Sequence, residues 1–243
     1  MMTEKQEKEL LEIQCRKQAE SRKVRSTAAF YDADYWGEYW GARFNSFPDE
    51  NDPVTKNETL KKVEFIKRYF TRCQSILDCA CSFGFIPAAF QDIGWRAAGV
   101  DISKAAIEHA PERVRDKIYP VSITDMNMFA DSSFDLVCAF DVLEHLYIEE
   151  IMPAVSEISR VAKYSILLRL PVPSFGAEPG QADLSHEGLT REHVSMYDTM
   201  WWARRFHERN KFRFWFSQIW NNSEELHAPV AEGWIAFGLT RNG

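Results

Sequence analysis

A run of short apolar segments that alternate with helix-like segments constrains the fold of this chain more than any other feature. Five of these segments have the character of buried strands: residues 75–81, 96–103, 119–125, 134–141 and 164–173. Between them the apolar side chains recur at helical spacing, for example over residues 142–161. Strands that alternate with helices build a parallel sheet with helices on both faces. The sequence therefore predicts an α/β fold with a doubly wound sheet.

The amino-terminal part of the chain follows another pattern. Residues 46–58 contain two prolines and several Asp and Asn residues, which predicts a loop, and a helix is predicted from Thr59 onward. This boundary separates a charged helix and an aromatic cap segment, residues 1–58, from the α/β domain, residues 59–243.

The carboxyl-terminal part departs from the alternation as well. A helix is predicted over residues 198–210, and two strand-like segments, 212–220 and 233–241, follow it with no helix between them. Strands joined without a crossover helix pair in antiparallel fashion. We therefore expect a seven-stranded sheet that is parallel except at one edge.

Composition and charge exclude several classes of protein. The 243 residues suffice for one domain with its own core, and the net charge of −7 argues against a general nucleic-acid binder. No apolar run has membrane-spanning length, and the first residues lack the apolar core of a signal peptide. The five cysteines lack the spacing of a zinc or redox site, so we expect buried, reduced thiols and a cytoplasmic protein.

Small residues follow the first predicted strand, where a doubly wound sheet binds nucleotides. The strand ends at Asp78, and Ala80, Ser82 and Gly84 then allow a tight turn and a close approach of the backbone to a ligand. The next helix directs the positive end of its dipole at this turn. Because the turn contains a single glycine, it does not match the pyrophosphate-binding fingerprint of dinucleotide enzymes, which disfavours an oxidoreductase.

Acidic side chains end the next two predicted strands. Asp101 follows the second strand, where a carboxylate can accept hydrogen bonds from both hydroxyl groups of a ribose. Asp125 follows the third strand and can accept a hydrogen bond from the amino group of an adenine. Together these positions favour a cofactor that contains a nucleoside.

Four motifs in order give the chain a specific resemblance, namely ILDCACSFGF, GVDIS, ITDMNMFADSSFDLV and FDVLEHL. They resemble those of the class I, Rossmann-like methyltransferases that use S-adenosylmethionine. The nearest group includes the ubiquinone-pathway O-methyltransferases and many natural-product and sugar methyltransferases. The resemblance covers roughly residues 60–175, and the strand pair at 212–241 suits the sheet edge of that family. The chain departs from the family at Ala80 and Ser82, where glycine is usual.

The resemblance implies where the cofactor binds. Asp101 would hold the ribose, Ile102 would flank the adenine, Asp125 and Met126 would bind the adenine edge, and Phe140 would lie beside the sulfonium. The full set of expected cofactor contacts is Asp78, Ala80, Gly84, Asp101, Ile102, Asp125, Met126 and Phe140.

Three histidines are candidates for a general base. Methyl transfer requires alignment of the acceptor and, where the acceptor has a proton to lose, a group that removes it. His145 follows the fourth strand, whereas His186 and His193 fall in residues 171–200, where this family inserts a lid over the substrate. O-methylation of a small molecule is therefore the leading hypothesis, while N- or C-methylation and a cofactor-binding protein without turnover remain alternatives.

The same region allows a metal site instead. Asp141, Glu144, His145 and His186 resemble the divalent-metal ligands of small-RNA 2′-O-methyltransferases and of ubiquinone-pathway O-methyltransferases. Asp141 is one methylene shorter than the glutamate of that pattern, and a helical stretch would place Asp141 and His145 on one face. A purely structural role for this string is the third interpretation.

Aromatic residues are candidates for substrate contacts. Tyr31, Tyr35 and Trp36 lie in an aromatic segment that can close over the cofactor, and Tyr197 shares a predicted helical face with His193. The alternative is that these rings pack on the domain. Residues 201–216 mix basic and aromatic side chains, but the acidic net charge disfavours a nucleic-acid substrate.

Overall fold

The computed structural model describes residues 48–172, 199–210, 212–219 and 233–241, together with Glu12, Ser195 and Tyr197. Its helices are α4 (Pro53–Tyr69), α5 (Phe85–Asp92), α6 (Lys104–Glu108), α7 (Glu112–Arg115), the 3-10 turn η2 (Leu143–His145), α8 (Ile148–Val161) and α9 (Thr199–Asn210). Its strands are β1 (Ser75–Cys79), β2 (Arg96–Val100), β3 (Ile118–Tyr119), β4 (Phe134–Phe140), β5 (Ala162–Val172), β6 (Phe212–Ile219) and β7 (Gly233–Arg241).

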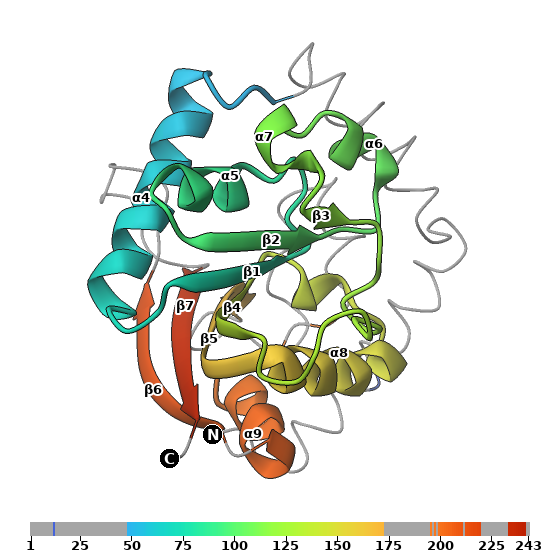
Figure 1. Ribbon diagram of the computed structural model, residues 1–243. Coiled ribbons are helices and arrows are strands. Elements are labelled where there is room, and N and C mark those ends of the chain that lie inside the picture. Colours follow the sequence, from blue (N-terminus) through green and yellow to red (C-terminus); the bar gives the residue numbers. More distant parts are fainter. Residues whose placement is uncertain are drawn as a thin grey trace.

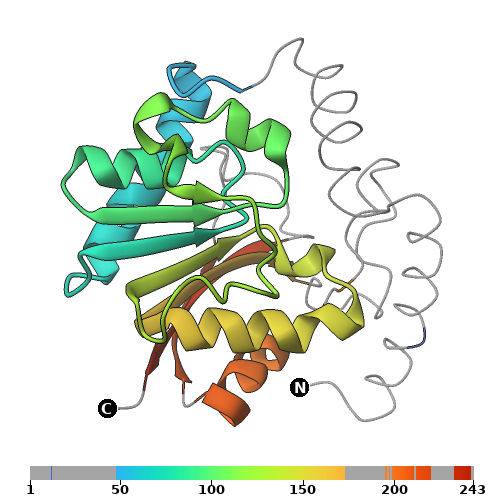
Figure 2. The same cartoon turned by 45° about the vertical axis from the view of Figure 1, so that its right-hand side comes forward.

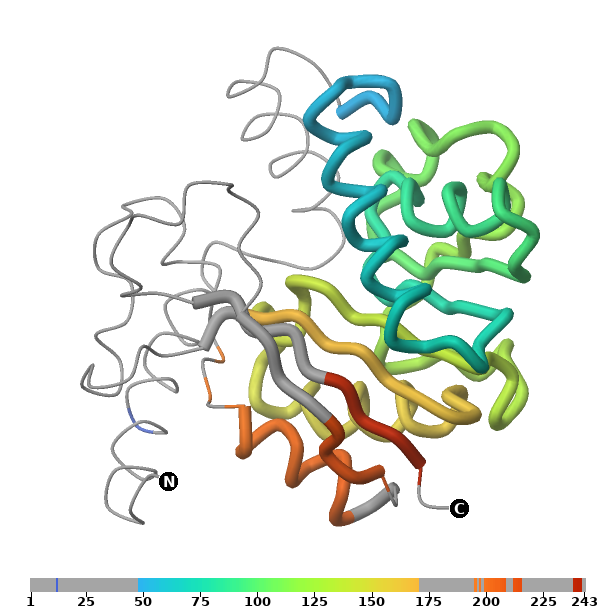
Figure 3. Tube along the Cα trace, turned by 90° about the vertical axis from the view of Figure 1, so that its left-hand side faces the viewer, coloured from blue at the N-terminus to red at the C-terminus, as the bar shows by residue number. Residues whose placement is uncertain are grey.

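The sheet confirms the predicted fold class. Its seven strands lie in the order β3-β2-β1-β4-β5-β7-β6. The strands from β1 to β5 pair in parallel, whereas β7 is antiparallel to both β5 and β6 (Figures 1 and 3). The strand order reverses between β1 and β4, and ligands of open α/β sheets bind outside the carboxyl ends of the strands at such a point.

Helices cover both faces of the sheet, as the alternation of strands and helices predicts. The helices α4 and α5 lie on one face, and α8 and α9 lie on the other (Figures 1 and 2). Ile66 of α4 and Phe90 of α5 are fully buried against the first face, and Ile158 of α8 and Trp202 of α9 against the second. Every residue of β1 is buried, which explains why that strand is a continuous apolar run.

The helix α4 begins earlier than the sequence predicts. Asp52 caps the helix, because its carboxylate accepts hydrogen bonds from the backbone N–H groups of Val54 at 3.0 Å and Thr55 at 2.9 Å. Pro53 occupies the first helical position, where a missing N–H costs nothing. The prediction of a loop over residues 46–58 was therefore wrong from residue 53 onward, because the proline marks a helix start.

The predicted third strand and the helix after the fourth strand are both shorter than expected. The strand β3 contains two residues, and the chain from Val121 to Asp125 leaves the sheet. The helix expected over residues 142–161 is interrupted, because Leu146 has an extended backbone and α8 starts afresh at Ile148. The Glu150 carboxylate accepts a hydrogen bond from the Tyr147 N–H at 2.8 Å and so stabilises this second start.

The described part of the chain contains no helix long and apolar enough to span a membrane. The four cysteines that the structure describes, Cys73, Cys79, Cys81 and Cys138, are buried and free, as expected. Burial raises the pKa of the Cys73 thiol to about 12. Cys15 and the rest of residues 1–47, apart from Glu12, lie outside the described residues, as do 173–194 of the expected lid.

Candidate active site

The turn after β1 has three residues in the left-handed backbone region. The φ angles are 58° at Ala80, 51° at Ser82 and 68° at Gly84. A Cβ atom at Gly84 would meet the end of the Ile118 side chain and would be strained at this φ angle, so glycine is favoured there. Ala80 and Ser82 adopt the same backbone region without being glycine, which costs roughly 1–2 kcal/mol for each residue. The tight turn expected from the small residues therefore forms, with strain at two of them.

Asp101, at the carboxyl end of β2, holds this turn in place. Its Oδ2 accepts a hydrogen bond from the Ser82 N–H at 2.7 Å, and its Oδ1 accepts one from the Ser103 N–H at 2.8 Å. The residue is only 8% exposed. Each carboxylate oxygen has a second lone pair, so Asp101 can secure the strained turn and still accept hydrogen bonds from a ligand in the adjacent cavity.

The strain in the turn gives a testable expectation. Ala80→Gly is expected to leave the fold intact and to raise the free energy of unfolding by up to about 1 kcal/mol, since relief of strain is partly offset by the entropy of glycine in the unfolded chain. Gly84→Ala is expected to lower it by more than that, because it adds both strain and the contact with Ile118. Urea denaturation of the three proteins measures both changes, and a destabilised Ala80→Gly variant would contradict the interpretation.

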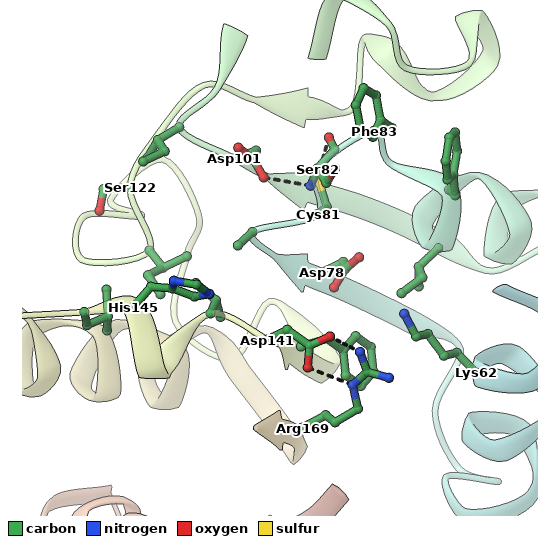
Figure 4. A pocket seen from close by; sticks show the side chains of 18 of the residues that line it. Lys62, Asp78, Cys81, Ser82, Phe83, Asp101, Ser122, Asp141, His145 and Arg169 are labelled. Carbon is green, nitrogen blue, oxygen red and sulfur yellow. Dashed lines mark hydrogen bonds and ion pairs between the residues drawn. The ribbon is translucent and has the colours of Figure 1, made fainter. Parts of the chain in front are cut away.

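A cavity of about 930 Å³ opens at the carboxyl ends of β1, β2 and β4. Several residues expected at the site line it, namely Asp78, Ala80, Asp101, Ile102, Phe140, Asp141 and His145. Figure 4 shows Asp101 and Ser82 on one side of this cavity, His145 on another, and Asp78 on the side of Lys62 and Arg169. The structure thus brings together residues from three predicted strands and from the turn η2.

Two of the charged groups that line the cavity form an ion pair with each other. Arg169 of β5 donates a hydrogen bond from Nε to Asp141 Oδ1 at 2.8 Å, and its second nitrogen pairs with Oδ2. The Asp141 backbone has a φ of 57° and donates its N–H to the carbonyl oxygen of Arg169 at 2.8 Å. Asp141 therefore lies outside η2, and the expectation that it shares a helical face with His145 was wrong.

Asp78 of β1 and Lys62 of α4 are two further charged groups in the lining. Asp78 is 2% exposed, and its Oδ1 atom has no hydrogen-bond partner. Burial raises the pKa of Asp78, although nearby Lys62 opposes this, and burial lowers the pKa of Lys62. The Lys62 amine extends toward Asp78 and the Asp141–Arg169 pair (Figure 4).

His145 is fixed by its neighbours in the turn η2. Ser195 donates its N–H to the carbonyl of Glu144 at 2.9 Å and its hydroxyl to the carbonyl of Leu146 at 2.6 Å. These two carbonyls flank His145, so Ser195 holds the backbone that presents the imidazole to the cavity. The sequence gives no sign of this contact, because Ser195 lies 50 residues away from His145.

Residues 77–165 match a family model described as a methyltransferase domain. These residues therefore carry the sequence signature of a methyltransferase domain. Lys62 and Arg169 both lie outside the matched residues.

Solved structures with the same fold extend over most of the chain. Magnesium protoporphyrin IX methyltransferase from Synechocystis PCC 6803, solved with bound S-adenosylhomocysteine, is 13% identical, with a TM-score of 0.61 over 88% of this chain and 97% of its own. Geranyl diphosphate C-methyltransferase from Streptomyces coelicolor A3(2) is 13% identical, with a TM-score of 0.61 over 86% and 96%. The 1,6-didemethyltoxoflavin-N1-methyltransferase from Burkholderia thailandensis is 13% identical, with a TM-score of 0.57 over 89% of each chain. A search of curated proteins finds no match.

Two residues that were expected to bind the edge of the adenine do not line the cavity. Asp125 is exposed, and Met126 is buried in the core with its N–H donated to Glu157 Oε2 at 2.7 Å. Neither residue lines the cavity, where Val121, Ser122 and Ile123 form the wall instead. Gly84 also lies outside the lining and acts through the shape of the turn. Cofactor contacts of Asp125 and Met126 stay a prediction.

Among the described residues, the proposed metal ligands do not come together in one site. Glu144 is fully buried, and both of its carboxylate oxygens lack a hydrogen-bond partner in the described chain. Burial raises the pKa of Glu144 to about 8. Asp141 is held by Arg169, and the described ranges contain no group of three His, Cys, Asp or Glu side chains suited to a metal ion. His186 lies outside the described residues, so the metal site stays a prediction.

Of the remaining candidate substrate-binding and catalytic residues, one lies in the core and the others lie outside the described residues. Tyr197 is buried in the core and stacks on Trp201 with ring centroids 3.6 Å apart, away from the residues that line the cavity. His186, His193, Tyr31, Tyr35 and Trp36 lie outside the described residues. Their substrate and catalytic roles stay predictions.

Proposed function

We propose that this chain transfers the methyl group of S-adenosylmethionine to a small-molecule acceptor bound in the 930 Å³ cavity. The observation that carries the proposal is the group of carboxylates at the ends of adjacent strands, with an unpartnered Asp78 oxygen and Asp101 beside the strained turn. These groups match a ligand that combines positive charge with ribose hydroxyls. The family match over residues 77–165 supports the same assignment.

The residues in the cavity fit this cofactor group by group. Asp101 can accept the ribose hydroxyls, and the apolar side chains of Ile102 and Val121 can flank the adenine. When bound, the cofactor supplies a methyl group on a positively charged sulfur. The chain's own contribution is to orient this group toward the acceptor and to exclude water from the cavity.

The finer proposal is O-methylation with His145 as the general base. His145 lines the cavity, and Ser195 fixes the backbone on either side of it. The imidazole would take the proton of an acceptor hydroxyl as the oxygen attacks the methyl carbon, and the neutral thioether would leave. Because similar structures include a C-methyltransferase and an N1-methyltransferase, the acceptor atom belongs to this proposal.

Calorimetric titration with S-adenosylhomocysteine tests the proposal without knowledge of the acceptor. We expect a dissociation constant on the order of micromolar and no binding of NADH, which serves as the control. A folded protein that bound NADH, or that bound neither compound, would contradict the proposed function. His145→Ala is expected to keep the affinity for S-adenosylhomocysteine and to lose turnover once an acceptor has been found.

A further inference from the structure

Arg169 is a charged residue in the buried part of strand β5. Its neighbours Leu168 and Leu170 are fully buried, and Arg169 itself is 6% exposed. The guanidinium pairs with both carboxylate oxygens of Asp141, and the Arg169 carbonyl oxygen accepts the Asp141 N–H at 2.8 Å (Figure 4). Asp141 also has a positive φ of 57°, which is uncommon for a residue other than glycine. Backbone and side-chain contacts thus hold one carboxylate against one guanidinium.

Stability of the fold does not account for this ion pair. Taking two charges out of water costs about as much free energy as their attraction returns, so apolar side chains of similar volume would serve the fold as well. Both side chains also line the cavity, where a ligand would lie beside them. A fixed pair of opposite charges in a binding cavity points to a role in the electrostatics of the ligand.

The order of the strands places this pair near the reacting sulfur atom of the cofactor. Neighbouring strands follow one another as β2, β1, β4 and β5. Asp101 follows β2, Asp141 follows β4, and Arg169 lies opposite Phe140 in the pairing of β4 with β5. With the ribose at Asp101 and the acceptor at His145, as proposed above, the sulfur lies between these two groups. The carboxyl end of β4, and with it Asp141, lies in that interval.

We propose that Arg169 sets the charge at the point of methyl transfer by neutralising Asp141 beside the sulfonium. During transfer the acceptor atom bonds to the methyl carbon, the carbon–sulfur bond breaks, and its electron pair neutralises the sulfur. An unpaired carboxylate at this point would therefore stabilise the cationic donor more than the transition state and slow the reaction. The proposal rests on the proposed function and makes Arg169 a positioning residue, which acts through Asp141.

The donor and its product together test this role, because S-adenosylmethionine carries a positive sulfur and S-adenosylhomocysteine a neutral one. The measured quantity is the ratio of their two dissociation constants, obtained by calorimetry. Arg169→Met leaves Asp141 unpaired and is expected to shift this ratio by about tenfold or more in favour of S-adenosylmethionine. Asp141→Asn leaves Arg169 without its carboxylate and is expected to shift the ratio by a similar factor in favour of S-adenosylhomocysteine.

Two further variants separate charge from structure. The double variant Asp141→Asn/Arg169→Met has neither charge, so its ratio should return to within about threefold of the wild type. Arg113→Met removes an arginine that pairs with Glu50 and Asp92 and does not line the cavity, so it should leave the ratio unchanged. Asp141→Asn is nearly isosteric with the wild type and decides the test even if Arg169→Met does not fold.

The outcomes distinguish this proposal from the proposed function. A folded wild-type protein that binds neither compound contradicts the proposed function. Binding of both compounds with an unchanged ratio in Arg169→Met and Asp141→Asn leaves that function standing and overturns the role of Arg169. A shift in the same direction in both single variants, or one that the double variant does not reverse, indicates altered packing and overturns that role as well.

The kinetics give a second readout once an acceptor is known. Arg169→Met is expected to lower kcat and to lower the KM for S-adenosylmethionine as well, because the unpaired carboxylate holds the donor too tightly before the reaction. A raised KM for the donor would contradict the proposed role.

Discussion

Asp101→Ala is expected to weaken the binding of S-adenosylhomocysteine by about 100-fold or more. The substitution removes the carboxylate proposed to accept the ribose hydroxyls, and hydrogen bonds to a charged group contribute about 1.5–3 kcal/mol each. It also removes the acceptor for the Ser82 N–H at 2.7 Å, which holds a strained residue of the turn. Both effects act on the same ligand, so the loss should exceed that of any other single change at the site.

Calorimetry on the variant and on two companions measures this effect. Asp116→Ala removes a carboxylate that is 71% exposed and pairs with Lys117 at the surface, so it should bind like the wild type. Asp101→Asn keeps one acceptor oxygen and is expected to lose less affinity than Asp101→Ala. Unchanged binding by a folded Asp101→Ala protein would remove Asp101 from the cofactor site.

The second large effect is expected from Glu144, through the pH dependence of stability. Its carboxyl group has a pKa of about 8 in the folded protein because it is buried, and about 4.3 in an unfolded chain. The folded state therefore binds the proton more tightly, and the free energy of unfolding falls as the pH rises between these values. The contribution lost by pH 8.5 is on the order of 4 kcal/mol. Glu144→Gln cannot ionise, so it should lack this component.

Urea denaturation at pH 5.5 and pH 8.5 tests this expectation. The wild-type protein should lose several kcal/mol more than Glu144→Gln between the two pH values, whatever the absolute stability of the variant. Glu64→Gln, an exposed position on α4, is the control and should follow the wild type. A parallel pH dependence of wild type and Glu144→Gln would show that Glu144 is ionised in the folded state.

The sequence predicted well those parts of the fold in which burial determines the order of apolar and polar residues. The strands β1, β2, β4 and β5 are buried on both sides over most of their length, so each shows as a mainly apolar run. The extent of β3 could not be predicted, because residues 120–125 remain extended in pattern yet leave the sheet. The break between η2 and α8 could not be predicted from the sequence either, because the apolar residues keep their helical spacing across it.

The candidate site was predicted where it follows from strand ends, and missed where it depends on packing between distant elements. Asp78 and Asp101 line the cavity because the carboxyl ends of parallel strands meet there. Arg169 left a trace in the sequence, as a charged residue inside an apolar strand. Lys62 left none, because its neighbour Lys61 looks the same in a helical pattern, and only the tertiary fold turns one of them into the cavity.

The acidic and basic residues of the cavity come from different parts of the sequence. The carboxylates Asp78, Asp101 and Asp141 come from the matched residues 77–165, whereas the cations Lys62 and Arg169 come from the segments on either side. A shortened protein cut at the matched boundaries would keep the acidic wall and lose both counter-charges, along with the helix α4 that covers one face. A comparison confined to that segment would include the carboxylates of the cavity without the cations that balance them. A comparison of the charge in this cavity with that in another protein thus requires the flanking residues as well.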